Sequence, residues 1–177
     1  MICETISLTP FEGATLTALC TTNYWEDRHP LHRAVIVCPG GGYGDVSHRE
    51  AEPVAAHFLA AGFATFILRY TVNEGARDWA PLKQLALAIR HVRENADKYY
   101  IDPDYVFTCG FSAGGHLAAS AGILWDSPVL DEVLNGAPRD IARPTGMILS
   151  YPVISATVPT HLNSFRRLSG IEDFTLE

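Results

Sequence analysis

Short apolar runs that alternate with helical patterns constrain this chain more than any other feature of its sequence. Residues 34–38 (AVIVC) and 64–70 (ATFILRY) are apolar almost throughout, which is typical of strands covered on both faces. Between the later strands, residues 81–96 place apolar side chains at the i, i+3, i+4 spacing of a helix with one buried face. This alternation predicts parallel strands joined by crossover helices. We therefore expect an α/β fold with a mostly parallel twisted sheet and helices on both faces.

Three further segments complete the expected sheet. Residues 2–9 and 14–22 alternate apolar and polar residues around a turn, which predicts an N-terminal antiparallel hairpin. Residues 105–109 and 145–151 read as two more buried strands. A helix is expected directly after the first of these two.

A helix start is also expected after the first buried strand. Ser47 and Glu50 match the S-x-x-E pattern of a capping box, in which the two side chains satisfy free amides at a helix N-terminus. Gly62 is a good helix terminator. We therefore predict a helix over residues 48–61.

Composition limits the classes of function that fit. The chain has 177 residues, of which 47% are hydrophobic and 19% charged, as expected of one globular domain over residues 1–177. A net charge of -7 and a pI of about 5.4 argue against a nucleic-acid partner, which would require a clustered Lys/Arg surface. Neither a secretory leader nor an apolar run of about 18 residues is present, so we expect a cytoplasmic protein without membrane contact.

The cysteines and histidines predict no metal site and no cofactor. The four cysteines stand alone in strand-like segments without a CxxC pair, which favours small, buried, reduced thiols. The seven histidines show no helical or strand spacing with a carboxylate that would make a convincing metal site.

The strongest chemical motif is the G-x-S-x-G at residues 110–114, between an expected strand and an expected helix. In this context Ser112 would sit on a sharp turn that lifts its hydroxyl out of the sheet, and the flanking glycines remove side chains that would collide there. The backbone amide of Ala113, at the positive end of the helix, would favour negative charge on a substrate oxygen. A plain glycine-rich connection and a phosphate-binding turn are the competing interpretations.

A second glycine-rich segment follows the first buried strand. The amides of Gly41 and Gly42 are predicted to act as further oxyanion donors, because such a donor must come from a loop with little side chain that faces the serine. A tight packing turn or a dinucleotide-binding loop would also need glycine. The segment lacks the G-x-G-x-x-G spacing, however, and the next strand ends in Arg69 rather than in an acidic residue that would hold a ribose.

The chain resembles the acetyl esterase and acetylxylan esterase group of the α/β-hydrolases, which is related to the hormone-sensitive-lipase-like esterases. The resemblance covers nearly the whole chain from about Val35 onward and rests on the order and spacing of PGGGY, REAEPVA, ATFILRYTV, PLKQLALAIRHVREN, IDPDYVFTCGFSAGGHLAAS, ILSYPVIS and HLNSF. It implies an α/β-hydrolase fold and a serine hydrolase of small acyl esters, often acetyl groups on sugars. It also implies a nucleophile at Ser112 with backbone donors at Gly41, Gly42 and Ala113.

Two positions depart from the family pattern. Pro39 replaces the histidine of the HGGG motif, as the resemblance allows in this group. Gln84 stands where relatives often carry an acidic residue in the helix before the nucleophile.

The larger departure concerns the rest of a catalytic triad. In this fold the acid and then the histidine follow the serine along the chain, each after a further strand. After Ser112 the histidines are His116 and His161, and none of the later aspartates ends a recognisable strand that is followed by another; these are Asp126, Asp131, Asp140 and Asp173. We therefore expect this chain to be the N-terminal two-thirds of such a hydrolase, without its last strands.

Neither remaining histidine is expected to be the general base. His116 lies four residues past Ser112 on the same helix, where packing is the simpler role, because a base must reach within hydrogen-bond distance of the nucleophile. His161 has the chain order of a base, and Asp140 or Asp126 could orient it. Its surroundings resemble a non-catalytic segment of the family, however.

The sequence therefore predicts a serine carboxylesterase acting on a small-molecule or carbohydrate acyl ester, nearly inactive in this chain for want of a base and an acid. Two alternatives remain open: a catalytically inactive α/β-hydrolase-like binding protein, and a peptidase of the prolyl-oligopeptidase type. We also expect residues 145–151 to form an uncovered apolar edge, which is an aggregation hazard and is compatible with a homo-oligomer.

Overall fold

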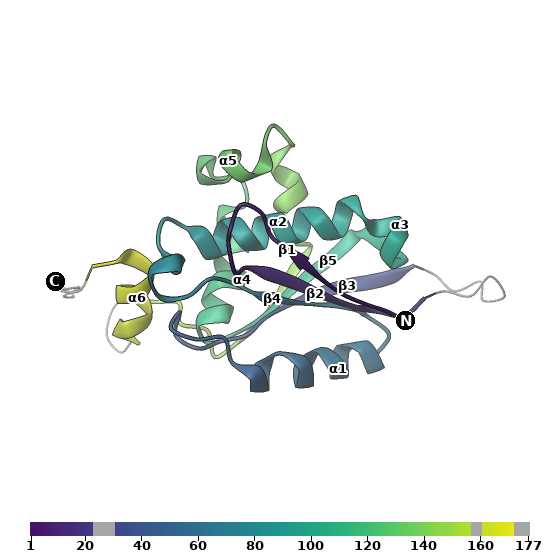
Figure 1. The fold of residues 1–177 in the computed structure, drawn as a ribbon, viewed down its shortest axis with the longest axis horizontal. Coiled ribbons are helices and arrows are strands. Elements are labelled where there is room, and N and C mark those ends of the chain that lie inside the picture. Colours follow the sequence, from purple (N-terminus) through teal and green to yellow (C-terminus); the bar gives the residue numbers. More distant parts are fainter. Residues whose placement is uncertain (23–30, 157–160, 172–177) are drawn as a thin grey trace.

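The computed structural model describes residues 1–22, 31–156 and 161–171, and within them the chain forms a six-stranded sheet. The strands lie in the order β1-β2-β4-β3-β5-β6 (Figure 1). Their bounds are β1 Ile2–Ser7, β2 Thr15–Cys20, β3 His32–Cys38, β4 Ala64–Arg69, β5 Ile101–Phe111 and β6 Gly146–Ser150. The α-helices are α1 Glu52–Ala60, α2 Ala80–Glu94, α3 Ala96–Tyr99, α4 Ala113–Leu124, α5 Asp131–Leu134 and α6 Leu162–Ser169. Short 3-10 turns are η1 His48–Glu50, η2 Asn73–Ala76, η3 Pro128–Leu130 and η4 Arg139–Ala142.

The strand pairings confirm the expected mixed sheet. β1 pairs antiparallel with β2, and β2 pairs antiparallel with β4, so the predicted hairpin forms one edge of the sheet. The remaining pairs, β4 with β3, β3 with β5 and β5 with β6, are all parallel. The carboxyl ends of β3 and β5 therefore lie side by side, and both glycine-rich segments begin there.

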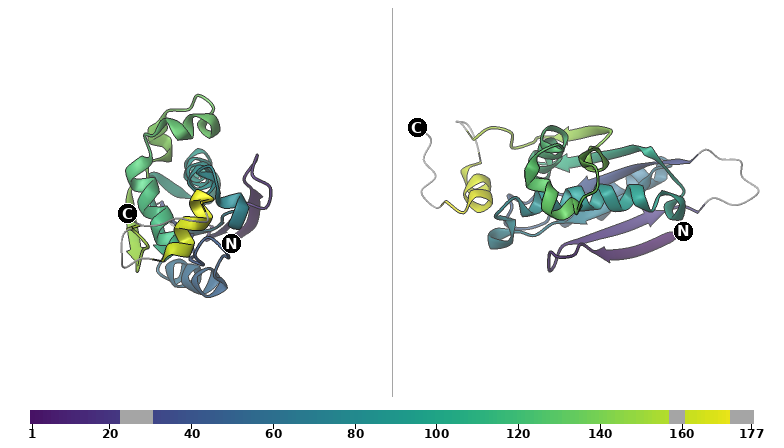
Figure 2. Two further views of the ribbon diagram at one scale, coloured as in Figure 1. Left: turned by 90° about the vertical axis from the view of Figure 1, so that its left-hand side faces the viewer. Right: turned by 90° about the horizontal axis from the view of Figure 1, so that it is seen from above.

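Helices cover both faces of this sheet, as Figures 1 and 2 show. On one face, α2 and α4 pack against each other and against β3 and β5, around buried side chains such as Ile36, Ile89 and Leu117. On the other face, α1 packs against β4 through a smaller cluster that includes Val37 and Ala55. Alternate residues of β3 thus serve opposite faces, which explains why its sequence is apolar without alternation. Among the described helices, none is both long and apolar enough to cross a bilayer.

The helix predicted over residues 48–61 starts later than expected. The structure has the 3-10 turn η1 first and begins α1 at Glu52, and the Ser47 side chain makes no capping hydrogen bond. Pro53 explains the boundary, because proline fits the first turn of a helix but disfavours helical geometry in the residue before it. Glu50, the expected second member of the capping box, binds elsewhere, as described below. The predicted stop at Gly62 is confirmed by its positive φ of 88°.

Two other sequence predictions need correction. The strand expected over residues 105–109 is longer, because β5 runs from Ile101 and accommodates Pro103 where its register with β3 shifts. Proline is tolerated at such irregularities, because the backbone at that position donates no hydrogen bond to the neighbouring strand. Of the four cysteines, Cys3 is exposed on the edge strand β1, whereas the other three are buried, and all four are free thiols.

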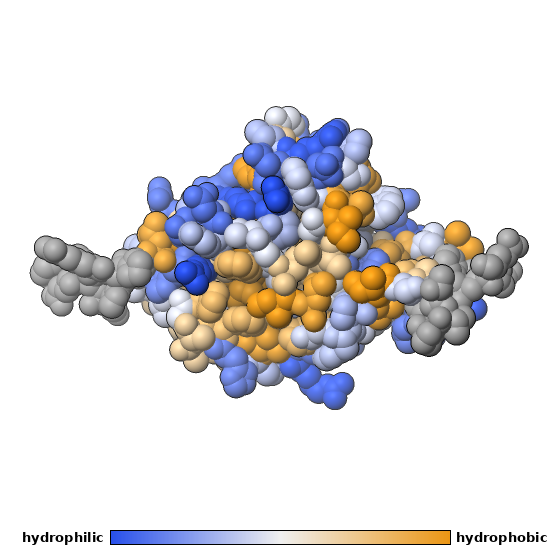
Figure 3. All heavy atoms as spheres, turned by 180° about the vertical axis from the view of Figure 1, so that it is seen from behind, coloured by the Kyte–Doolittle hydropathy of each residue, from blue (hydrophilic) through white to orange (hydrophobic). Residues whose placement is uncertain are grey.

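β6 is the edge strand of the described sheet, not a buried strand. The side chains of Met147, Ile148 and Leu149 are 42%, 43% and 39% exposed. β6 lies at the back of the molecule in Figure 1 and at the opposite edge from β1 in Figure 2. The face on that side carries a broad apolar patch (Figure 3). The expectation of an uncovered apolar edge is confirmed for the described residues.

We expect the Ile148→Lys substitution to reduce self-association of the chain while leaving its fold intact. A charged side chain on an exposed edge strand opposes pairing with a second chain, and the half-exposed position leaves room for lysine. Light scattering as a function of concentration measures the effect. Unchanged association of this folded variant would show that the β6 edge does not mediate it.

Candidate active site

Ser112 occupies a strained turn between β5 and α4. Its backbone angles are φ 51° and ψ −116°, a combination that costs a non-glycine residue about 1 to 3 kcal/mol. The turn is held from both sides, because the Ser112 amide donates to Ser150 O at 3.0 Å and Ser112 O accepts from the amides of His116 and Val153 at 3.0 and 3.2 Å. The strain is thus imposed by β6 and α4, which is the geometry that the G-x-S-x-G motif predicts.

The two glycines around Ser112 are required by close backbone packing. A Cβ atom on Gly114 would lie 2.0 Å from Cys38 O and 2.4 Å from Pro39 O, at the end of β3. A Cβ atom on Gly110 would lie 2.1 Å from Gly114 O. Only glycine allows the start of α4 to approach the ends of β5 and β3 this closely.

The glycine loop after β3, residues 39–42, lies directly beside Ser112. A Cβ atom on Gly40 would lie 3.1 Å from Ser112 Cβ. Gly41 and Gly42 have positive φ angles of 133° and 62°, and a Cβ atom on Gly41 would lie 2.1 Å from Asp45 O. The sequence prediction that this loop faces the serine is consistent with this geometry.

Glu50 is a residue of the site that sequence reasoning assigned to another role. Its Oε2 accepts the Gly40 amide at 2.7 Å, and its Oε1 accepts the Tyr151 hydroxyl at 2.7 Å. This hydrogen bond with Glu50, followed by burial, raises the pKa of Tyr151. The Gly40 amide is therefore already occupied, whereas the amides of Gly41 and Gly42 donate no hydrogen bond within the described part of the chain.

Ala113 is the first residue of α4 and follows Ser112 directly. The first amides of an α-helix have no carbonyl partner within that helix, and they carry its positive dipole end. The side chain of Ala113 is fully buried, so its methyl group packs into the core. Its amide and the glycine loop therefore flank Ser112 from α4 and from β3.

His116 points to the glycine loop rather than to an acid. Its Nδ1 lies 2.8 Å from the Tyr43 hydroxyl, and its ring packs edge-on against Tyr43 and Phe165. Burial lowers the pKa of His116, which favours the neutral ring. The expected packing role agrees with these contacts.

His161 lies closer to the site than its sequence context indicated. It precedes α6, its Nδ1 is 2.8 Å from Ser164 Oγ, and its Cε1 would be 3.2 Å from a Cβ atom on Gly42. From the same helix, Arg167 donates to Gly42 O at 3.0 Å. α6 thus packs on the glycine loop, although no hydrogen bond joins Ser112 Oγ to a histidine within the described residues.

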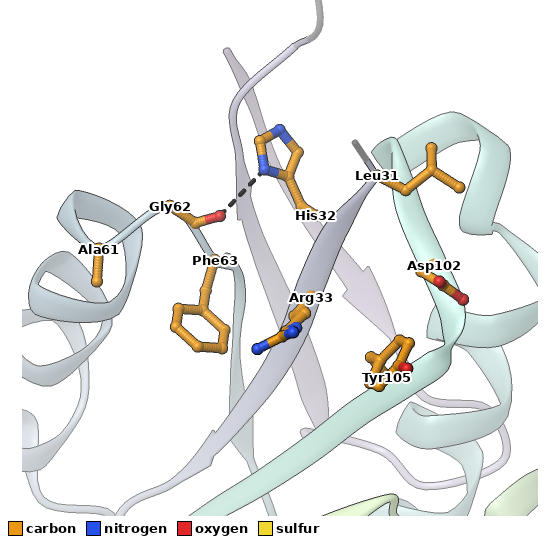
Figure 4. A pocket seen from close by; sticks show the side chains of 8 residues that line it. All are labelled: Leu31, His32, Arg33, Ala61, Gly62, Phe63, Asp102 and Tyr105. Atoms are coloured by element: carbon orange, nitrogen blue, oxygen red, sulfur yellow. Dashed lines mark hydrogen bonds between the residues drawn. The ribbon is translucent and has the colours of Figure 1, made fainter. Parts of the chain in front are cut away.

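A cavity of about 500 Å³ lies at the amino-terminal end of the central strands, whereas Ser112 lies at their carboxyl end (Figure 4). It is lined by residues at the starts of β3, β4 and β5, including Arg33, Phe63 and Tyr105, and His32 Nδ1 there lies 3.0 Å from Gly62 O. Ligands of open α/β sheets bind at the carboxyl ends of the strands, where Ser112 lies. No group of three metal-ligating side chains occurs within the described part of the chain.

Comparison with known proteins identifies the family. The family model described as BD-FAE matches residues 25–166. The chain belongs to the BD-FAE family. Its six-stranded sheet and the Ser112 turn form part of an α/β-hydrolase fold.

Three proteins are similar to this chain in sequence or in structure. The chain is 39% identical over 140 residues to endo-1,4-beta-xylanase B of Butyrivibrio fibrisolvens, covering 77% of this chain and 22% of that protein. It is 34% identical over 128 residues to an acetylxylan esterase of Xylanibacter ruminicola, covering 72% of this chain and 24% of that protein. The crystal structure of an acetyl ester-xyloside bifunctional hydrolase from Caldicellulosiruptor lactoaceticus superposes with a TM-score of 0.74 and 35% identity, covering 88% of this chain and 54% of that one.

The BD-FAE chain thus spans about a quarter of the two relatives and about half of the solved structure. Two of the three proteins, the acetylxylan esterase and the acetyl ester-xyloside hydrolase, are named for ester hydrolysis.

Proposed function

We propose that this chain carries the nucleophile and the oxyanion donors of a serine carboxylesterase that removes short acyl groups, acetyl above all, from carbohydrate. The observation that carries the proposal is the strained Ser112 turn, set beside a glycine loop whose first amide is already taken by Glu50. Strain at one residue, maintained by several backbone hydrogen bonds, is typical of a functional position.

The chemistry follows from these parts. Ser112 Oγ attacks the ester carbonyl carbon, and its proton passes through a general base to the departing alcohol as the old ester bond breaks. The amides of Ala113 and of Gly41 or Gly42 stabilise the negative charge on the carbonyl oxygen. Water then hydrolyses the acyl-serine and regenerates the hydroxyl.

This proposal assigns the general base and its acid to none of the residues that the structure describes. Within the described residues, neither His116 nor His161 makes a hydrogen bond to Ser112 Oγ; their Nδ1 atoms lie 2.8 Å from the Tyr43 hydroxyl and from Ser164 Oγ. Without a base, oxyanion donors and binding provide only about 10³- to 10⁴-fold acceleration over water. Acylation of Ser112 should therefore be slow, and deacylation slower still.

We propose a carbohydrate as the alcohol component of the ester substrate because of the names of the similar proteins. Two of them are named for xylan or xyloside chemistry and for acetyl esters, and a third is a xylanase. The prolyl-oligopeptidase type of peptidase, which shares the serine turn, gains no support from these names.

We expect p-nitrophenyl acetate to acetylate Ser112 of this chain, slowly and without efficient turnover. Mass spectrometry of the peptide that contains Ser112 measures the acetyl group over time, and the Ser112→Ala variant should lose it. Ser120→Ala is the matched control, because that hydroxyl lies on the same helix and donates to a backbone oxygen, His116 O, at 2.8 Å. An unmodified Ser112 after prolonged incubation would instead favour a binding protein without catalysis.

A further inference from the structure

Tyr43 directly follows the glycine loop, and its backbone is held in a conformation that is costly for an aromatic residue. Its φ is 55°, in the left-handed region that an aromatic residue seldom occupies. Its side chain is nevertheless only 2% exposed. The ring packs against Tyr70 at 5.7 Å between centroids and against His116 at 5.9 Å. Tertiary contacts therefore determine where the end of this loop lies.

One hydrogen bond joins this loop end to the helix of the nucleophile. The Tyr43 hydroxyl lies 2.8 Å from His116 Nδ1. Burial lowers the pKa of His116 and raises the pKa of Tyr43, so the bond joins two neutral groups. In a neutral imidazole one nitrogen accepts and the other donates, and we assign Nδ1 as the acceptor of the phenol proton.

The backbone of His116 leads directly back to the nucleophile. Its amide donates to Ser112 O at 3.0 Å, so the ring that holds Tyr43 stands one turn above the serine. At the other end of the loop, the Tyr70 hydroxyl donates to Pro39 O at 2.7 Å. The loop is thus anchored on both sides of its glycines, to Tyr70 directly after β4 at its start and to α4 at its end.

We propose that Tyr43 and His116 form a positioning pair that fixes the amides of Gly41 and Gly42 relative to Ser112. The effect of the pair on catalysis rests on the proposed function. Its effect on the position of the loop rests on the contacts alone. Neither residue touches substrate; both act through the glycine loop. The loss of one oxyanion donor lowers kcat by about 10²- to 10³-fold, so a loosened loop should cost roughly tenfold.

Amide hydrogen exchange of the chain itself tests the pair without any need for catalysis. The amides of Gly44 and Asp45 donate to Gly41 O at 3.0 and 3.2 Å, so their exchange reports whether the loop is closed. In Tyr43→Phe and His116→Leu, we expect exchange at both amides to become roughly tenfold faster, as the loss of one net hydrogen bond allows. In His116→Asn, exchange should stay near the wild-type rate, because Oδ1 replaces Nδ1 as the acceptor.

The chain offers a matched control for global stability. Tyr99 and His91 form a second tyrosine–histidine hydrogen bond, at 2.9 Å, with ring centroids again 5.9 Å apart. This pair lies beside β1, where Tyr99 also donates to Glu4. Because the Tyr99 hydroxyl makes two hydrogen bonds, Tyr99→Phe should destabilise the chain at least as much as Tyr43→Phe and leave the loop amides unchanged.

The kinetic measurement is acetylation of Ser112 by p-nitrophenyl acetate as a function of ester concentration. Tyr43→Phe, His116→Leu and the double variant should each lower the limiting rate by a similar factor with half-saturation unchanged, and His116→Asn should restore the rate. Faster loop exchange in a chain that never acetylates Ser112 would support the pair and count against the proposed function. Unchanged loop exchange in folded Tyr43→Phe and His116→Leu would overturn the pair.

Discussion

Replacement of Gly114 by alanine is expected to destabilise the chain by at least about 3 kcal/mol, a large part of the 5 to 15 kcal/mol that stabilise a typical domain. The added methyl group would lie 2.0 Å from Cys38 O and 2.4 Å from Pro39 O. Both are backbone atoms at the end of a central strand, so neither can turn aside as a side chain would. Alanine must therefore push α4 away from β3 and open the core between α2, α4 and the sheet. Urea denaturation measures the change.

Gly62→Ala is the matched control for this prediction. Gly62 has a positive φ of 88°, but a Cβ atom there would meet nothing within 4 Å. Its cost comes only from the left-handed backbone, about 1 to 2 kcal/mol for an L-residue. A Gly114→Ala variant that is no less stable than Gly62→Ala would contradict the close approach of α4 to β3.

The sequence predicts the fold well where the physical cause is local. The apolar runs of β3 and β4 and the helical spacing of α2 each report burial of that segment, and the structure confirms all three. The apolar run of β6 predicts a strand, but apolarity alone does not tell a covered strand from the uncovered edge that β6 forms in the described sheet.

Other features were missed because their causes lie far apart in the chain. Glu50 fits a capping box in sequence, yet its carboxylate binds Gly40 and Tyr151, and the second partner is 101 residues away. The pairing of Tyr43 with His116 spans 73 residues. No local spacing could predict either contact.

The candidate site also has features that the sequence predicts and features that it does not. The motif around Ser112 predicts that glycines are needed on both sides of the serine, and both glycines meet backbone atoms that leave no room for a Cβ. The motif does not specify which part of the chain packs against each glycine. Gly114 packs against the end of β3, and the glycine loop begins at that same point. A single close contact therefore holds the nucleophile and the loop together.

Gly41→Ala should disturb this arrangement from the side of the loop. A φ of 133° is unsuited to any L-residue, and the new Cβ atom would lie 2.1 Å from Asp45 O. The turn in which Gly41 O accepts the amides of Gly44 and Asp45 must therefore rearrange. We expect a loss of about 2 to 3 kcal/mol in stability. If Gly41 or Gly42 supplies an oxyanion donor, acetylation of Ser112 should slow by about 10²- to 10³-fold.

Gly44→Ala separates a specific role of the Gly41 turn from general damage to the loop. The three atoms nearest to a Cβ atom on Gly44 all belong to the guanidinium of Arg167, with Cζ at 2.5 Å, and that flexible side chain can move away. The variant loses the hydrogen bond from Arg167 to Gly42 O but keeps the turn at Gly41. The test is to measure the free energy of unfolding and the rate of Ser112 acetylation for both variants. Equal acetylation rates in Gly41→Ala and Gly44→Ala would mean that this turn places no donor at Ser112, because only the first substitution forces its backbone to move.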